Sequence, residues 1–199
     1  MTDARFERTR AIVYQAVSQV LVSEGLVGLT VDRIAAESGI ARSTIYRNWP
    51  DLAALACEAF DELMHQEPLN LGADPSTGLH DYLVDYARRL NDPTYTAMLV
   101  ALIEGSWRDD AFAEVHRRAF SQTRSRAASI IRGAQKEGLI DARLDIAQCV
   151  EDLVAPFLYR RVVTQNRITP RQVEELHSRL LERWTPAEKK RAQLDSSER

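Results

Sequence analysis

One stretch near the N-terminus, residues 30–49, constrains the fold of this 199-residue chain most, because its pattern predicts two short helices joined by a tight turn. Thr30 can cap the first helix through its hydroxyl. Gly39 marks the turn, since glycine accepts the positive φ that other residues resist. Ile45 and Trp49, four residues apart, can anchor the second helix on one side. The stretch therefore predicts a helix-turn-helix.

The outer face of the second helix is rich in hydrogen-bond donors and amphipathic groups. With the inner side anchored, the residues that point outward are Arg42, Ser43, Thr44, Tyr46 and Arg47. Such groups suit phosphates and base edges, and the second helix of this motif enters the major groove of DNA. The pattern indicates DNA binding.

The net charge of −3 is not typical of a nucleic-acid binder, so the distribution of charge matters more than its sum. The first fifty residues carry six arginines against five acidic residues, a net charge of +1, and the remainder carries −4. The arginines gather in the N-terminal arm and around the turn, where phosphates would sit. The sequence leaves open whether Arg5, Arg8 and Arg10 of the arm reach DNA.

Helical periodicity continues beyond the motif. Apolar residues recur at helical spacing on both sides of residues 66–77, where proline, glycine and polar residues interrupt the pattern, and no strand-like alternation is present. A long helix is predicted from about residue 110 to 137, and Asp145 and Thr169 each mark a helix start with a glutamine three residues later. The sequence predicts an all-α protein. Its expected parts are a helix-turn-helix domain over residues 6–66, a helical body over 67–185 and a disordered tail over 186–199.

Several classes of protein are not expected. No apolar run approaches the roughly 20 residues of a membrane span, and the N-terminus has no signal-peptide pattern, so we expect a cytoplasmic protein without a membrane partner. Cys57 and Cys149 lie far apart in apolar helical patterns, which favours buried thiols over a disulfide or metal site.

An enzyme of the di-iron helical bundle class is also not expected. Glu62 with His65, and Glu174 with His177, have the Glu-x-x-His spacing of such sites. Helical projection points His65 to solvent, and no second pair of inward glutamates completes a site. Phosphate-binding glycine loops and nucleophile elbows are absent from the sequence as well. We therefore predict no catalysis, no metal and no cofactor.

The segment from about Phe6 to Gln66 resembles the DNA-binding domain of TetR/AcrR-type transcriptional regulators. The motifs that carry the resemblance are Leu29-Thr30-Val31, Ile34-Ala35, Gly39-Ile40, Thr44-Ile45-Tyr46-Arg47 and Trp49-Pro50. The resemblance implies a three-helix module whose third helix enters the major groove of double-stranded DNA, and a homodimer that reads a palindrome. The DNA-binding residues predicted in this way are Thr30, Arg42, Ser43, Thr44, Tyr46 and Arg47. Arg33, near the turn, is added to this set.

Two departures from the family pattern have a consequence for affinity. Ala41 stands where a capping serine is common, and Leu52 stands where members often carry a phosphate-binding lysine. We expect a shallower salt dependence of DNA binding than is usual in the family, by about one phosphate contact per subunit.

In the family, a small apolar ligand binds inside the helical body and changes DNA affinity, which implies a ligand-sensing and dimerisation domain over residues 67–185. The predicted ligand-binding residues are Tyr82, Tyr86, Met98, Leu102, Trp107, Phe112, His116 and Phe120. In the family, the last two helices form a four-helix dimer interface. The predicted interface residues are Leu153, Phe157, Arg161, Val173, Leu176, His177, Leu180 and Trp184.

The resemblance implies a ligand-responsive regulator, with repression as the family's commonest mode. One alternative stays open at this point, a DNA-binding regulator whose body is structural and binds no ligand. Aromatic and methionine side chains at helical spacing are often plain core, so the ligand-binding residues do not decide between the two. The other alternative, a helical metalloenzyme, lacks the ligands described above.

Overall fold

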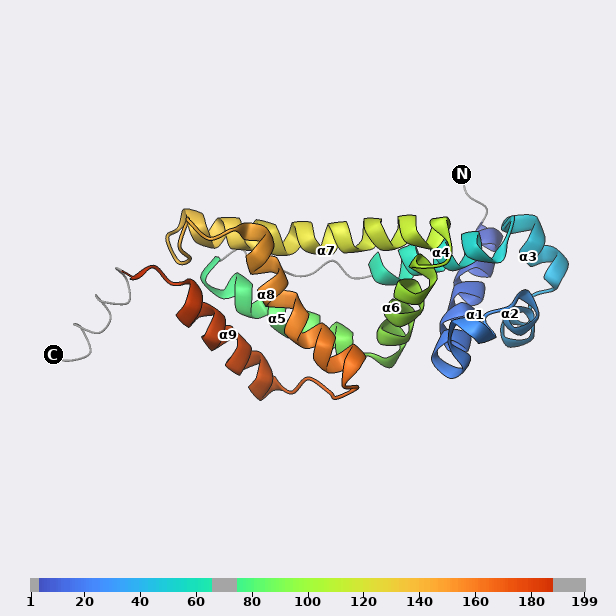
Figure 1. Ribbon diagram of the computed structural model, residues 1–199. Coiled ribbons are helices and arrows are strands. Elements are labelled where there is room, and N and C mark those ends of the chain that lie inside the picture. The colour runs from blue at the N-terminus through green and yellow to red at the C-terminus, as the bar shows by residue number, and fades with distance from the viewer. Residues whose placement is uncertain (1–3, 66–74, 188–199) are drawn as a thin grey trace. The chain divides into compact units, whose positions relative to one another are not determined.

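The computed structural model describes residues 4–65 and 75–187, and over these ranges it contains helices and short turns but no strand. The all-α prediction is therefore confirmed. The elements are α1 (Ala4–Gly28), α2 (Val31–Ser38), α3 (Arg42–Asn48), α4 (Leu52–His65), α5 (Pro75–Asn91), α6 (Pro93–Ser106), α7 (Asp110–Lys136), α8 (Ile146–Leu158), the π-helical turn η1 (Tyr159–Val163) and α9 (Pro170–Trp184) (Figure 1). Most of the interruption at residues 66–77 and most of the predicted tail lie outside the described residues.

Side-chain caps define several helix starts, as the sequence predicts. The Thr169 hydroxyl accepts from the backbone N–H of Gln172, whose side chain accepts from the backbone N–H of Thr169, so α9 begins with a complete capping box. Asp145 accepts from the N–H of Gln148 at the start of α8. Asp92 caps α6 in the same way.

The described residues form two compact units, the first built from residues 4–65 and 92–121 and the second from 75–91 and 122–187. The first unit contains α1 to α4, α6 and the start of α7. The second contains α5, the rest of α7, α8 and α9. After α5 the chain returns to the first unit, where α6 packs against α1.

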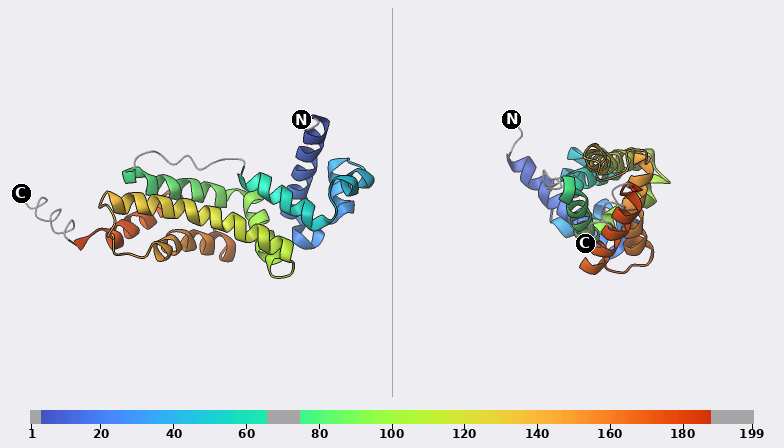
Figure 2. Two further views of the ribbon diagram at one scale, coloured as in Figure 1. Left: turned by 90° about the horizontal axis from the view of Figure 1, so that it is seen from above. Right: turned by 90° about the vertical axis from the view of Figure 1, so that its left-hand side faces the viewer.

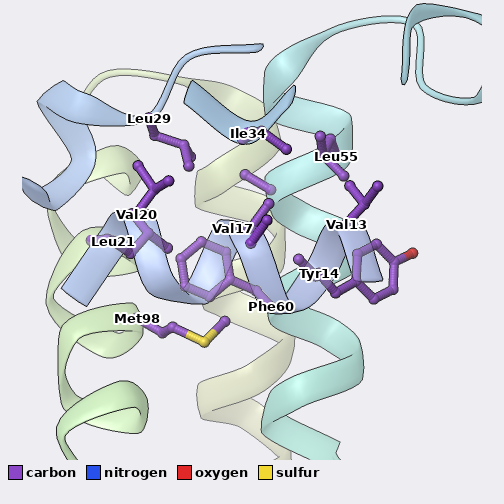
Figure 3. Packing of buried hydrophobic residues seen from close by; sticks show 14 of the residues in the cluster. Val13, Tyr14, Val17, Val20, Leu21, Leu29, Ile34, Leu55, Phe60 and Met98 are labelled. Atoms are coloured by element: carbon purple, nitrogen blue, oxygen red, sulfur yellow. The ribbon is translucent and has the colours of Figure 1, made fainter. Parts of the chain in front are cut away.

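The core of the first unit is built around α1. Val17 and Val20 of α1 are almost fully buried, with Ile34 of α2 on one side and Met98 of α6 on the other (Figure 3). Burial of each such side chain contributes about 1.5–3 kcal/mol relative to exposure. By length and composition alone α1 could cross a membrane, but many of its apolar side chains, Val17 and Val20 among them, lie in this core.

The second unit is held together by α5 packed against α8 and α9 (Figure 2). The Asn91 side chain fastens the segment before α9 to the end of α5, because it donates to the Ile168 carbonyl at 2.7 Å and accepts from the Ile168 N–H at 2.9 Å. The α8 helix continues through Pro156 and widens into the π-helical turn η1.

The two cysteines are free thiols. Cys149 is buried, as predicted, whereas Cys57 is only half-buried. Burial raises the pKa of Cys57 to about 11, with the negative charge of Asp109 as the next cause. Both thiols therefore stay protonated near neutral pH.

Candidate DNA-binding surface and regulatory body

The turn between α2 and α3 has the predicted geometry. The Thr30 hydroxyl accepts from the Arg33 N–H at 3.2 Å, and Gly39 adopts a φ of 69° while its N–H bonds to the Ala35 carbonyl. The Ser38 hydroxyl accepts from the Ile40 N–H at 3.1 Å and tightens the turn. These contacts fix the direction in which the chain enters α3.

The orientation of α3 agrees with the outward face predicted from the sequence. Ile45 and Trp49 are each 1% exposed and face the core of the first unit. Tyr46 is 60% exposed. Of the other residues of the predicted outward face, Arg42, Ser43 and Arg47 are exposed and Thr44 is half-buried. A phenol, a hydroxyl and two guanidinium groups thus lie exposed on one short helix.

Two of the predicted DNA-binding arginines are paired with carboxylates. Arg42 Nε lies 2.8 Å from Asp32 Oδ1, and both side chains are more than half exposed. Arg33 Nε donates to Glu24 Oε1 at 2.9 Å, which links α2 to α1 and holds the pKa of Glu24 below its usual value. Exposed ion pairs contribute little to stability, so a DNA phosphate can compete for either guanidinium.

The far end of α3 is fastened by contacts that sequence reasoning missed. Trp49 Nε1 donates to Glu58 Oε2 at 2.9 Å, and the Tyr14 hydroxyl donates to the same oxygen at 2.8 Å. Burial and this bond to Glu58 raise the pKa of Tyr14 to about 12. A buried indole N–H needs an acceptor, which is the one signal in the sequence that points to such a partner.

Arg10, one of the three arm arginines, is engaged within the first unit. Its guanidinium carbon lies 5.4 Å from the centre of the Tyr14 ring, and its Nε donates to the Tyr14 hydroxyl at 3.2 Å. It also forms an ion pair with Glu7 at 3.2 Å. These contacts give Arg10 a structural role, whereas Arg5 and Arg8 are exposed.

The predicted ligand-binding residues are divided between the two units. Tyr82 and Tyr86 stack on each other in the second unit, with ring centres 5.9 Å apart. The other six belong to the first unit. Met98, Leu102 and Phe112 occupy core positions of this unit. His116 and Phe120 are half-buried, and Trp107 is largely exposed.

Trp107 is placed differently from the other predicted ligand-binding residues. It follows α6 and is 86% exposed, so it does not line an interior cavity of the single chain. Met98, Leu102 and Phe112 pack in the core of the first unit, where they contact other side chains. A groove of about 610 Å³ in this unit is lined by other residues, among them Arg10, Tyr14, Ser18, Glu62 and Thr94.

Most of the predicted interface residues are buried within the single chain. Leu153, Phe157, Val173, Leu176, Leu180 and Trp184 are at most 5% exposed in the single chain. Arg161 donates to the Leu90 carbonyl at 2.9 Å, so it too is engaged within its own unit. A side chain with no exposed surface gains no further burial from a partner. The broad apolar faces of α8 and α9 are therefore largely the core of the second unit.

His177 and Glu174 are turned toward α5. The His177 and His80 rings lie 5.2 Å apart, and His80 Nε2 lies 2.8 Å from Glu174 Oε1. Burial lowers the pKa of His177, and the neighbouring His80 lowers it further. Among the residues whose side chains the structure describes, no group of three His, Cys, Asp or Glu side chains could hold a metal, and His65 lies outside that set.

Comparisons with known proteins agree with this geometry. Residues 14–59 match the family model described as bacterial regulatory proteins of the tetR family. Residues 73–180 match the model described as a tetracyclin repressor-like C-terminal domain.

Individual relatives extend along nearly the whole chain. YdeS of Bacillus subtilis (strain 168), described as an uncharacterized HTH-type transcriptional regulator, is 26% identical over 86% of this chain and 87% of its own length. A candidate transcriptional regulator from Pseudomonas aeruginosa PAO1 has the same fold, with a TM-score of 0.74, 20% identity and coverage of 88% of this chain and 89% of its own. The flavonoid-responsive regulator FrrA aligns with a TM-score of 0.65 and 20% identity, over 91% of this chain and 99% of its own.

The helix-turn-helix, its exposed α3 face and the helical body define a DNA-binding transcriptional regulator rather than an enzyme. The two family models together cover most of the chain, and the protein belongs to the TetR family.

Proposed function

We propose that the protein is a cytoplasmic, homodimeric repressor that binds a palindromic operator and is released from it by a small apolar molecule. The observation that carries this proposal is the exposed face of α3, which presents the side chains of Arg42, Tyr46 and Arg47. The other side of the helix is anchored in the core by Ile45. In this arrangement Thr30 and Tyr46 contact phosphates. Arg42, Ser43, Thr44 and Arg47 contact bases or phosphates, and Arg33 contacts the adjoining backbone.

Dimerisation follows from how such a helix reads DNA. Two copies of α3 must lie about 34–36 Å apart, one turn of DNA, to enter successive major grooves. We place the partner surface on the exposed sides of α8 and α9, in place of the buried residues first predicted. Two grooves of about 860 and 800 Å³ are lined by both helices, and their shared residues are Pro156, Leu176 and Arg179. Tyr159, 62% exposed at the first groove, offers an aromatic contact of the kind enriched in interfaces.

A ligand response is the finer part of the proposal. The structural relative FrrA is described as flavonoid-responsive, which supports an aromatic or otherwise apolar effector. Of the residues predicted to bind it, we retain two pairs as alternative candidates: the half-buried His116 and Phe120 of the first unit, whose rings lie 4.3 Å apart, and the stacked Tyr82 and Tyr86 of the second unit. Met98, Leu102 and Phe112 take part only if the ligand displaces packed neighbours.

The tight packing of these three core residues favours a second candidate function, a TetR-family regulator whose body binds no ligand. A thermal shift screen against hydrophobic small molecules separates the two, because a ligand that binds only the native protein raises its melting temperature. A compound that raises the melting temperature and also releases the protein from its operator supports the repressor with a ligand. If no compound in a broad library does either, the ligand-free regulator is the better account.

A further inference from the structure

One carboxylate oxygen joins three helices of the first unit. Glu58 Oε2, on α4, accepts from the Trp49 indole N–H at the end of α3 and from the Tyr14 hydroxyl on α1, at 2.9 and 2.8 Å. Hydrogen bonds to an ionised acceptor are stronger than neutral ones. The two donor residues are almost fully buried, at 1% and 3% exposed, whereas Glu58 lies at an exposed position of α4.

The Tyr14 hydroxyl extends this contact to the N-terminal part of α1. It accepts from Arg10 Nε at 3.2 Å while it donates to Glu58. The Phe6 and Tyr14 rings flank Trp49, with centres 6.4 and 6.1 Å from its own. The end of α3 is therefore enclosed by aromatic rings and held in one orientation by a single acceptor.

The helix that depends on this contact is poorly stabilised by itself. It has only seven residues, and Ala41 at its N-cap makes no side-chain hydrogen bond. An uncapped helix of this length is not stable alone. Its orientation is set by the packing of Ile45 and Trp49 and by the bond from Trp49 to Glu58.

We propose that Glu58 is a positioning residue for DNA recognition: its carboxylate fixes the end of α3 against α1 and α4, and so sets the direction in which Tyr46 and Arg47 project. The inference rests on the proposed entry of α3 into the major groove.

The first half of the test concerns the hydrogen bond itself and uses no DNA. In the full ¹⁵N-labelled chain, the indole N–H signal of Trp49 is assigned with a Trp49→Phe variant. Glu58→Ala is expected to move this signal upfield and to speed its exchange with solvent, because the acceptor is gone. Glu58→Gln, whose amide oxygen still accepts, restores much of the wild-type signal. Glu37→Gln, an equal charge change at an exposed position of α2, leaves it unchanged.

The second half measures DNA binding by fluorescence anisotropy on a selected operator and on an unrelated duplex. Glu58→Ala is expected to weaken operator binding by about tenfold or more, because a charge-assisted bond that orients α3 is lost. The loss of affinity for the unrelated duplex is expected to be smaller, because misdirected Tyr46 and Arg47 weaken only phosphate contacts there and no base contact is lost. If Glu58→Ala does not fold, Tyr14→Phe, which removes only one hydroxyl, takes its place with a smaller loss in the same direction.

An unchanged Trp49 signal, or operator affinity within twofold of wild type in a folded variant, overturns the inference. Equal losses on both duplexes also overturn it, because they indicate general damage to the domain. These outcomes differ from failure of the proposed function, in which the wild-type protein itself shows no preference for any duplex.

Discussion

Arg42 of α3 and Asp32 of α2 form an ion pair with a separation of 2.8 Å between Nε and Oδ1 on the surface proposed to meet DNA. The carboxylate therefore competes with phosphate for this guanidinium. It also repels phosphate directly, so Asp32 lowers DNA affinity in two ways.

Replacing Asp32 by asparagine is expected to tighten DNA binding by about two- to fivefold, the range that follows from the free energy of an exposed ion pair. Loss of an acidic residue from the first turn of α2 costs about 0.3–1 kcal/mol of stability. Anisotropy titrations at fixed salt measure the first effect. The matched control is Glu37→Gln on the same helix, and an equal gain in that variant would show that Arg42 is not the group released.

The salt dependence of DNA binding tests whether the absence of a lysine at position 52 removes a phosphate contact. Leu52→Lys is expected to steepen the slope of log affinity against log salt by about one per subunit, because one phosphate contact is added. Arg42→Ala is expected to reduce it by a similar amount. Ser125→Lys, an equal charge added to an exposed site on α7, serves as the control. A steep wild-type slope that Arg42→Ala leaves unchanged contradicts the assignment.

The turn glycine gives a prediction for stability. Gly39 has a φ of +69°, and a Cβ built there meets no atom within 4 Å, so any effect of Gly39→Ala comes from backbone strain alone. We expect a loss of about 1 kcal/mol. Gly78→Ala, inside α5 with its nearest atom at 3.5 Å, is expected to stabilise by about 0.5–1 kcal/mol. Thermal denaturation of both variants measures these changes in stability. We expect a lower melting temperature for Gly39→Ala and a higher one for Gly78→Ala.

The Tyr14 hydroxyl is expected to make the free energy of unfolding depend on pH. Its pKa is raised from 10.0 to about 12 by burial and then by the bond to Glu58, so folding favours the protonated form. Its contribution to the free energy of unfolding is complete below pH 10 and is lost as the pH rises toward 12. Absorbance titration of the wild type and Tyr14→Phe should show one late-titrating tyrosine that is missing from the variant. A normal titration of Tyr14 would show that the hydroxyl is solvated.

Helix ends and faces could be predicted from the sequence because their signals are local. Thr30 and Thr169 cap the helices that follow them. Gly39 adopts the positive φ that the turn requires, because it has no side chain. Periodicity also identified the anchors Ile45 and Trp49. These features depend on residues within one or two turns of each other, so no tertiary information is needed.

Tertiary partners could not be predicted in this way. Periodicity in α8 and α9 shows that one face is buried but not what buries it, and Leu153 and Leu180 proved to be core of their own unit. The contact of Tyr14 with Glu58 joins residues 44 positions apart, and neither has a local signal for the other. The predicted ligand-binding residues are divided between the two units, and helical spacing alone carries no signal for that division.

Selection of bound sequences from a random DNA pool by the purified chain tests the central claim most directly. A dimer that places two α3 helices in successive major grooves enriches a palindrome whose half-sites lie about one helical turn apart. The Tyr46→Ala variant, which lacks the exposed phenol on α3, should enrich the same sequence more weakly. Recovery of no preferred sequence by a chain that is monomeric at micromolar concentration would contradict the account.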